Sequence, residues 1–249
     1  MASARYTINI KPEDLLPEEP PKKMTKEQKR ANFWFYHKWH VIIGFFVLLL
    51  VSYVIYTTVT TVQPDYTIGI MTQEGLPEEV LTAVQDALAP YATDRNGDGK
   101  IYVNVLAYQT AASGQTSNSS TDPYLQMAGS TQLMSDLSIG TSMIFLVDDV
   151  ALRWADAEIF LQNDGTYSET PDFDNIGYAW ADCPVLAALP LGNIEYYDGT
   201  TGPAIQSLLG KYTVVLRDVE HTQLASKQKN LDYFEDCKAM YNKMTEAAT

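Results

Sequence analysis

The chain has 249 residues, of which 17 are Lys or Arg and 31 are Asp or Glu, so its net charge is −14. The charge is unevenly divided, with +3 on residues 1–60 and −17 on residues 61–249. Such an acidic C-terminal part excludes nucleic acid as a partner and disfavours anionic lipid, because both bind to cationic protein surfaces. Its length suits a single domain with one hydrophobic core.

Residues 41–59 form an uncharged apolar segment that is long enough to cross a membrane. A helix rises about 1.5 Å per residue, and the hydrocarbon core of a bilayer is about 30 Å thick. Trp34, Tyr36 and Trp39 precede the segment and suit the lipid headgroup region. We therefore predict one transmembrane helix over residues 39–60, in contact with the lipid bilayer through residues 41–59.

The charges around this segment predict its orientation. The first charge after it is Asp65, and the basic residues near it all precede it, at Lys22, Lys23, Lys26, Lys29 and Arg30. Because cytoplasmic flanks carry the excess of Lys and Arg, residues 1–38 are predicted to be cytoplasmic and residues 63–249 extracellular. Residues 1–38 are polar and proline-rich, which predicts a disordered tail. No small-residue cleavage site follows the apolar segment, so we expect an uncleaved signal-anchor in the cell membrane.

Residues 63–249 alternate between strand and helix patterns. Strands are predicted at residues 65–71, 101–108, 142–147 and 211–217, and helices at residues 77–91, 122–139, 150–161 and 229–246. The strand segments are short and apolar, as is typical of strands covered on both faces. The alternation predicts an α/β fold, namely a single-lobe, open, mostly parallel sheet with flanking helices, preceded by one transmembrane helix.

Residues 94–101 (DRNGDGKI) match the start of a calcium-binding loop. Asp94, Asn96 and Asp98 place side-chain oxygens at alternate positions, and the backbone carbonyl of Lys100 would add another ligand. The twelfth position is Val105 instead of Glu, and a strand is predicted to follow, so the segment is not an EF-hand. The alternative, which we favour, is a polar turn whose Asn-Gly and Asp-Gly pairs supply positive φ. Ca²⁺ is the only cofactor that the sequence indicates.

A second candidate site lies where predicted strands end, because ligands of open parallel sheets bind outside the carboxyl ends of the strands. Aromatic and acidic side chains there would line a cleft for a small polar, sugar-like solute. The alternative is that the tryptophans belong to the core and that the second aspartate caps the following helix. The candidate ligand-binding residues are Tyr108, Asp148, Asp149, Trp154, Tyr178 and Trp180.

The sequence contains no complete catalytic constellation, so we predict that the protein is not an enzyme. His221 is the only histidine after the apolar segment and lies in a polar loop. Ser226 and Lys229 have Ser-Lys spacing, without an apolar setting that would lower the lysine pKa. Cys183 and Cys237 are too few for a disulfide framework, and they could be bridged or free.

One segment resembles a known family. Residues 124–149 (YLQMAGSTQLMSDLSIGTSMIFLVDD) are similar to the helix-then-strand segment of type II extracellular solute-binding proteins, and residues 185–191 (VLAALPL) to their return toward the hinge. The resemblance covers residues 65–218 and implies one lobe of such a protein, because the chain has room for one lobe only. Residues 34–44 (WFYHKWHVIIG) resemble single-pass bacterial membrane proteins with a divergent extracellular domain.

Together these patterns predict a membrane-anchored, non-catalytic extracellular binding or accessory domain. Its partner would be an envelope protein or a small polar solute. The alternative is a structural or assembly component of a cell-envelope complex that takes no small-molecule ligand. An extracellular hydrolase is the least favoured hypothesis, because a nucleophile paired with a base is missing from the sequence.

Overall fold

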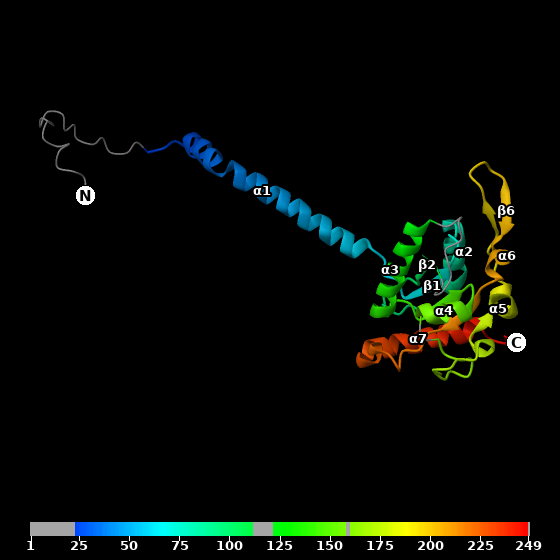
Figure 1. Ribbon diagram of the computed structural model, residues 1–249. Coiled ribbons are helices and arrows are strands. Elements are labelled where there is room, and N and C mark those ends of the chain that lie inside the picture. Colours follow the sequence, from blue (N-terminus) through cyan, green and yellow to red (C-terminus); the bar gives the residue numbers. More distant parts are fainter. Residues whose placement is uncertain (1–22, 112–121, 158–159, 249) are drawn as a thin grey trace, which may run out of the picture. The chain divides into compact units, whose positions relative to one another are not determined.

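The computed structural model describes residues 23–111, 122–157 and 160–248. The chain divides into two compact units, Met1–Thr61 and Val62–Thr249, and each is described by itself. The first unit contains the helix α1, and the second contains the strands together with the other helices of the described residues (Figure 1).

Helix α1 (Lys26–Thr60) begins at a capping box. The Thr25 hydroxyl accepts a hydrogen bond from the N–H of Gln28, and the Gln28 side chain accepts one from the N–H of Thr25. Residues 26–38 are therefore helical, although the sequence analysis placed them in a disordered tail. The predicted disorder of residues 1–22 concerns a segment that lies outside the described residues.

The apolar part of α1 is long and hydrophobic enough to cross a membrane, and none of it is buried inside the protein. Near its C-terminal end, the hydroxyls of Thr57, Thr58 and Thr60 donate to carbonyls three or four residues earlier, over 2.7 to 2.9 Å. Such bonds satisfy these hydroxyls without water, as a membrane environment requires. The predicted orientation in the membrane stays a prediction.

The second unit contains six α-helices, two of them very short, and several single turns of 3-10 helix within the described residues. The helices are α2 (Glu78–Leu88), α3 (Pro123–Ile139), α4 (Val150–Ala157), α5 (Pro184–Ala187), α6 (Ile205–Leu209) and α7 (Gln228–Met244). The 3-10 turns are η3 (Ala89–Tyr91), η4 (Phe173–Asn175), η5 (Trp180–Asp182) and η6 (Gln223–Ser226). A separate hairpin is formed by β5 (Asn193–Glu195) and β6 (Thr201–Ala204).

Five strands form one mixed sheet in the order β2-β1-β3-β7-β4. β1 (Tyr66–Thr72) is parallel both to β2 (Val103–Gln109) and to β3 (Ile144–Val147), as the alternation of strands and helices predicts. β7 (Thr213–Leu216) is antiparallel to β3 and to β4 (Tyr178–Ala179). The α/β class is thus confirmed, and the sheet is mixed because β7 runs opposite to the other four strands.

The reversed direction of β7 follows from the path of the chain between β3 and β7. β4 runs beside β7 in the same direction as β3, and it returns the chain to the carboxyl edge of β3. β7 therefore enters the sheet at that edge and runs the opposite way. The direction of this return is not encoded in a local pattern, because β4 is only two residues long.

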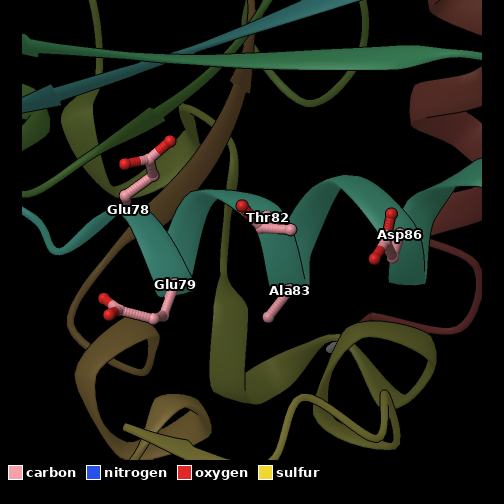
Figure 2. A pocket seen from close by; sticks show the side chains of 5 residues that line it. All are labelled: Glu78, Glu79, Thr82, Ala83 and Asp86. Carbon is pink, nitrogen blue, oxygen red and sulfur yellow. The ribbon is translucent and has the colours of Figure 1, made fainter. Parts of the chain in front are cut away.

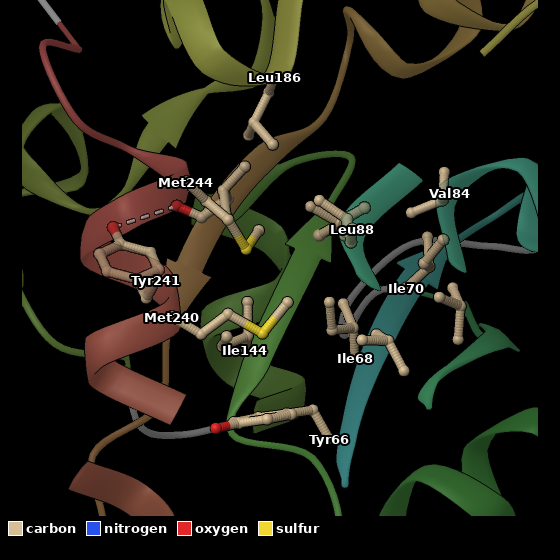
Figure 3. Packing of buried hydrophobic residues seen from close by; sticks show 14 of the residues in the cluster. Tyr66, Ile68, Ile70, Val84, Leu88, Ile144, Leu186, Met240, Tyr241 and Met244 are labelled. Atoms are coloured by element: carbon tan, nitrogen blue, oxygen red, sulfur yellow. Dashed lines mark hydrogen bonds between the residues drawn. The ribbon is translucent and has the colours of Figure 1, made fainter. Parts of the chain in front are cut away.

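Side chains on alternate positions of the strands point into two cores on opposite faces of the sheet. On β1, Ile68 and Ile70 belong to the first core and Met71 to the second. Helices α2 and α7 pack on the first core, where Figure 3 shows Leu88 of α2 and Met240 of α7 among the buried side chains. Helices α3 and α4 pack on the second core. The fold has three layers, with helices on both faces of the sheet.

Candidate functional site

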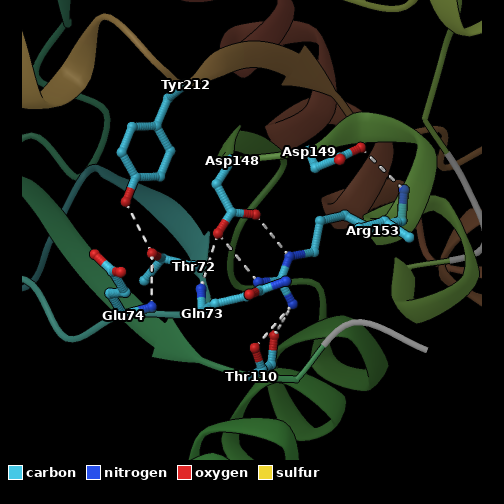
Figure 4. Close-up of polar contacts among 9 residues, drawn as sticks. Thr72, Gln73, Glu74, Thr110, Asp148, Asp149, Arg153 and Tyr212 are labelled. Atoms are coloured by element: carbon cyan, nitrogen blue, oxygen red, sulfur yellow. Dashed lines mark hydrogen bonds and ion pairs between the residues drawn. The ribbon is translucent and has the colours of Figure 1, made fainter. Parts of the chain in front are cut away.

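The carboxyl ends of β1, β2 and β3 meet where the strand order reverses. β1 lies between β2 and β3, and α2 and α3 cover opposite faces of the sheet. Ligands of open α/β sheets bind in the crevice at such a point. In this chain the crevice contains Thr72, Gln73, Thr110, Asp148 and Arg153 (Figure 4).

Arg153 fills this crevice with its guanidinium group, and its side chain is fully buried. Nε donates to Oδ1 of Asp148 over 2.9 Å, and Nη2 donates to Oδ2 over 3.3 Å. Nη1 donates to the carbonyl and the hydroxyl of Thr110 over 3.0 and 2.5 Å. Because α4 begins directly after β3, Arg153 lies five residues from Asp148 and can reach back over the strand end. The place of a ligand is thus taken by a cation of the chain itself.

Asp148 extends this network to the end of β1. Its Oδ2 accepts a hydrogen bond from the N–H of Gln73 over 2.8 Å. Nearby, the Tyr212 hydroxyl donates to that of Thr72 over 2.8 Å, and burial raises the pKa of Tyr212 to about 12. These contacts tie the ends of three parallel strands to α4. The predicted candidate Asp148 is therefore at the switch point, but it is paired with Arg153.

Tyr108, another predicted ligand-binding residue, is buried against α3. Its hydroxyl donates to Asp136, which also accepts hydrogen bonds from the N–H and the hydroxyl of Ser142 over 2.7 and 2.5 Å. Burial, together with the negative charge of Asp136, raises the pKa of Tyr108 well above its ordinary value. Tyr108 joins β2 to α3 and does not face a ligand cleft.

Asp149 caps α4, as the alternative interpretation of the sequence proposes. Its Oδ1 accepts a hydrogen bond from the N–H of Leu152 over 3.3 Å. Trp154, on the same helix, packs against the second core, and its ring lies 6.2 Å from those of Phe160 and Phe173.

Tyr178 and Trp180 lie on the other face of the sheet, with the first core. Trp180 is buried, and its Nε1 donates to Oε1 of Gln206 over 2.8 Å. The six predicted ligand-binding residues therefore do not converge on one cleft. Periodicity placed them near strand ends, but it did not reveal to which face each side chain points.

The calcium-like loop is closed by hydrogen bonds to its own backbone. The carboxylate of Asp94 accepts from the N–H groups of Gly97 and Gly99 over 2.7 and 2.9 Å. The side-chain oxygen of Asn96 accepts a hydrogen bond from the N–H of Asp98 over 2.8 Å. That of Asp98 accepts one from the N–H of Lys100, also over 2.8 Å. Gly97 and Gly99 have φ of 73° and 79°, as the turn interpretation requires.

In the part of the chain that the structure describes, no group of three or more His, Cys, Asp or Glu side chains could hold a metal ion. The exposed side of α2 does carry a shallow acidic groove of about 460 Å³, lined by Glu78, Glu79 and Asp86 with Thr82 and Ala83. Its carboxylates do not converge on one point (Figure 2). Glu78 and Glu79 instead stabilise the N-terminal end of the helix dipole.

A histidine–aspartate pair was missed by the sequence analysis, which treated His221 as a lone loop residue. Nδ1 of His221 lies 2.8 Å from Oδ2 of the buried Asp218, and the imidazole stacks on Tyr167 at 4.5 Å. The pair borders a hollow of about 300 Å³ whose lining includes Thr166 but no serine or cysteine. The usual nucleophile for acyl transfer is therefore not beside this base. The spacing of three residues was the only signal in the sequence.

The cysteines are both free and buried in the described structure. Burial raises the pKa of Cys183 to about 11 and that of Cys237 to about 12. Because the thiolate is the reactive form of cysteine, neither thiol is a nucleophile at neutral pH. Of the two alternatives that the sequence left open, the structure has the free pair.

A comparison with protein-family models gives no match, and comparisons with curated proteins and with solved structures give no significant one. The function is therefore inferred from the geometry of this chain.

Proposed function

We propose that this protein is a non-catalytic, membrane-anchored accessory domain that binds another protein of the cell envelope outside the cytoplasm. The proposal combines the membrane-spanning length of α1 with the surface of the second unit. The observation that carries it is the exposed side of α3.

The exposed side of α3 carries no charge and is rich in large apolar side chains. Five large apolar side chains of α3 are between 55 and 78 % exposed: Ile139 at its C-terminal end, and Tyr124, Leu125, Met127 and Met134, which are called here the α3 face. The only charged residue between Pro123 and Ile139 is Asp136, which is buried. The absence of exposed charge on α3 contrasts with the net charge of −17 on residues 61–249.

An uncharged apolar face on an acidic domain is typical of a protein-binding surface, because interface cores are depleted of charged residues. Methionine side chains adapt to a partner surface at low cost. We therefore expect the partner to offer an apolar helix face or groove. A small polar solute is less well supported, because the crevice that would hold it contains the Arg153–Asp148 pair.

Photo-crosslinking in cells tests the proposal. A photoreactive amino acid at Met127 or Met134 is expected to capture one discrete envelope protein in the membrane fraction. The matched control site is Thr82 on the acidic groove of α2, which should capture no such band. A double substitution, Met127→Glu with Met134→Glu, should abolish the band without loss of folding, because both side chains are exposed.

Other outcomes would contradict the proposal. Crosslinks only between copies of this chain would assign the α3 face to self-association. A rise in melting temperature with sugars or amino acids, and no crosslinked partner, would favour the solute-binding hypothesis.

A further inference from the structure

Three cations of the second unit line one cavity. Residues 61–249 contain nine Lys and Arg, and two of them, Arg153 and Arg217, are buried. Three of the remaining seven line a cavity of about 400 Å³, namely Arg95, Lys227 and Lys229. The overall acidity of the domain therefore does not describe this part of its surface.

The one carboxylate in the lining, Asp65, is directed into the protein. It is buried, and its oxygens accept hydrogen bonds from the N–H groups of Arg95 and Asn96 over 2.8 and 3.0 Å and of Tyr102 over 3.0 Å. Its charge is thus used to hold the loop after η3. The other charged residues of the lining are the three cations.

Arg95 already interacts with other side chains of the chain, whereas the two lysines form no ion pair with a described residue. Nε of Arg95 donates to Asp236 over 2.7 Å, and the guanidinium lies over the Tyr233 ring at 4.7 Å. Lys227 and Lys229 are exposed and form no ion pair with any described residue. They are therefore available to an anion from outside.

The lysines stand at the N-terminal end of α7, where the helix dipole is positive. Lys227 is the N-cap, no side chain caps the helix, and the first turn contains no acidic residue. Cations are unfavourable at this end of a helix, because the positive charge of the lysines adds to the positive end of the helix dipole. A bound anion would be attracted by both and would reduce this repulsion.

The cavity also lies close along the chain to the membrane-spanning helix. Gln63 and Pro64 belong to its lining, and α1 ends at Thr60. Only two residues, Thr61 and Val62, separate the last residue of that helix from Gln63 in the sequence. Ile139, which is 65 % exposed, completes the rim with an apolar side chain.

We propose that this cavity binds the phosphate of an anionic phospholipid headgroup, with Lys227 and Lys229 as its principal ligands and Ile139 in contact with the lipid interface. Lysines beside an exposed apolar side chain are the combination found on membrane-surface proteins. Repulsion from the acidic remainder of the domain is limited, because charges beyond about 8 Å from the headgroups are screened at physiological salt.

The experiment uses the full chain in lipid nanodiscs with an environment-sensitive dye at Ile139→Cys. Labelling is selective because Cys183 and Cys237 are buried. The dye is expected to shift to the blue in discs of phosphatidylcholine with phosphatidylglycerol, and not in discs of phosphatidylcholine alone. Adding Lys227→Gln and Lys229→Gln should lower the apparent affinity for phosphatidylglycerol about 30-fold, because each lysine near an anionic membrane contributes a factor of about five.

A matched control removes two other exposed lysines, Lys211→Gln with Lys243→Gln, and changes the net charge equally. It should keep the blue shift. The proposal is overturned if the two double variants behave alike, or if the shift is the same in both kinds of disc. It is also overturned as a lipid site if millimolar inorganic phosphate gives the same lysine-dependent shift in detergent while phosphatidylglycerol has no effect. Loss of the α3 crosslink would leave this result unchanged, so the two proposals fail independently.

Discussion

At the scale of single residues, the two buried arginines make opposite contributions. Arg153 is completely hydrogen-bonded to Asp148 and Thr110. Arg217 is buried, but its Nε and Nη1 have no hydrogen-bond partner within the described residues. Burial also lowers the pKa of Arg217, while the charges of Asp136 and Asp218 act in the opposite direction. A buried cation without full hydrogen bonding costs stability.

Arg153→Met is expected to destabilise the fold by about 3–5 kcal/mol, because it leaves the Asp148 carboxylate buried without its cation. Arg217→Met also replaces a buried cation by an apolar side chain, but here it should leave the stability unchanged or increase it. Urea unfolding of the full chain in detergent, followed by near-ultraviolet circular dichroism, measures both. Equal losses in the two variants would contradict this account of the buried charges.

Buried acids also predict how stability depends on pH. At pH 7 the thiols of Cys183 and Cys237 are protonated in both the folded and the unfolded chain, because the ordinary pKa of cysteine is about 8.5. Burial raises their folded pKa to about 11 and about 12, and that of Tyr212 to about 12. Above pH 9 the unfolded chain therefore loses protons that the folded chain retains, and stability falls as pH rises toward 12.

Urea midpoints at pH 8, 9.5 and 11 should decrease in that order. In Cys183→Ala with Cys237→Ala the decrease between pH 8 and 9.5 should be smaller, because tyrosine titrates later. A midpoint that is constant from pH 8 to 11 would show that these groups are exposed to solvent.

At the scale of the elements, α3 packs closely on the sheet at Gly129. A Cβ built there would lie 2.2 Å from the carbonyl oxygen of Gln109 on β2, and a backbone atom cannot move aside as a side chain does. Gly129→Ala should therefore push α3 away from β2 and cost about 1–3 kcal/mol, despite the better helix propensity of alanine. Ala128→Ser at the neighbouring exposed position is the control and should change the urea midpoint little. A stabilised Gly129→Ala variant would contradict the close approach.

Regular elements with a strong period could be predicted from the sequence, and irregular connections could not. The strands around Ile68, Val105 and Ile144 and the helix ending at Gly140 follow from apolar runs and cap residues. The antiparallel entry of β7 depends on long-range pairing with β3, which leaves no local pattern.

The candidate site was predicted less well than the fold, because its residues are defined by partners distant in sequence. Asp148 could be assigned to a strand end, but its pairing with Arg153 depends on the direction of one side chain. Tyr108 and Trp180 were proposed as ligand contacts, and each instead bonds to a residue more than twenty positions away. Composition alone could not distinguish stacking on a sugar from packing in a core.

At the scale of the whole molecule, two regions of the surface of the second unit differ in charge from the rest. Most of the second unit is acidic, whereas the α3 face is uncharged and the cavity at Lys227 and Lys229 is cationic. Each exception fits a different partner, an apolar protein surface in one case and a phosphate group in the other. Both proposals require that α1 anchors the chain in a membrane.

Membrane anchoring depends on the uncharged centre of α1. Leu48→Arg with Leu49→Arg places two cations there, and each is expected to cost about 2.5–3.5 kcal/mol of insertion free energy. The double variant should move to the supernatant on alkaline carbonate extraction, whereas Leu48→Ala with Leu49→Ala should stay in the membrane pellet. Retention of the arginine variant in the pellet would indicate that this helix does not hold the chain in the membrane.

The orientation follows from the same helix, since all the nearby basic residues precede it. Intact cells treated with a membrane-impermeant maleimide should label Glu246→Cys and should label Ser3→Cys only after permeabilisation. The buried native thiols provide a low background for this measurement. The reverse pattern would place the acidic domain in the cytoplasm, where a partner on the outer side of the membrane could not reach the α3 face. Orientation is therefore the condition on which the proposed partner depends, and the labelling should precede the crosslinking.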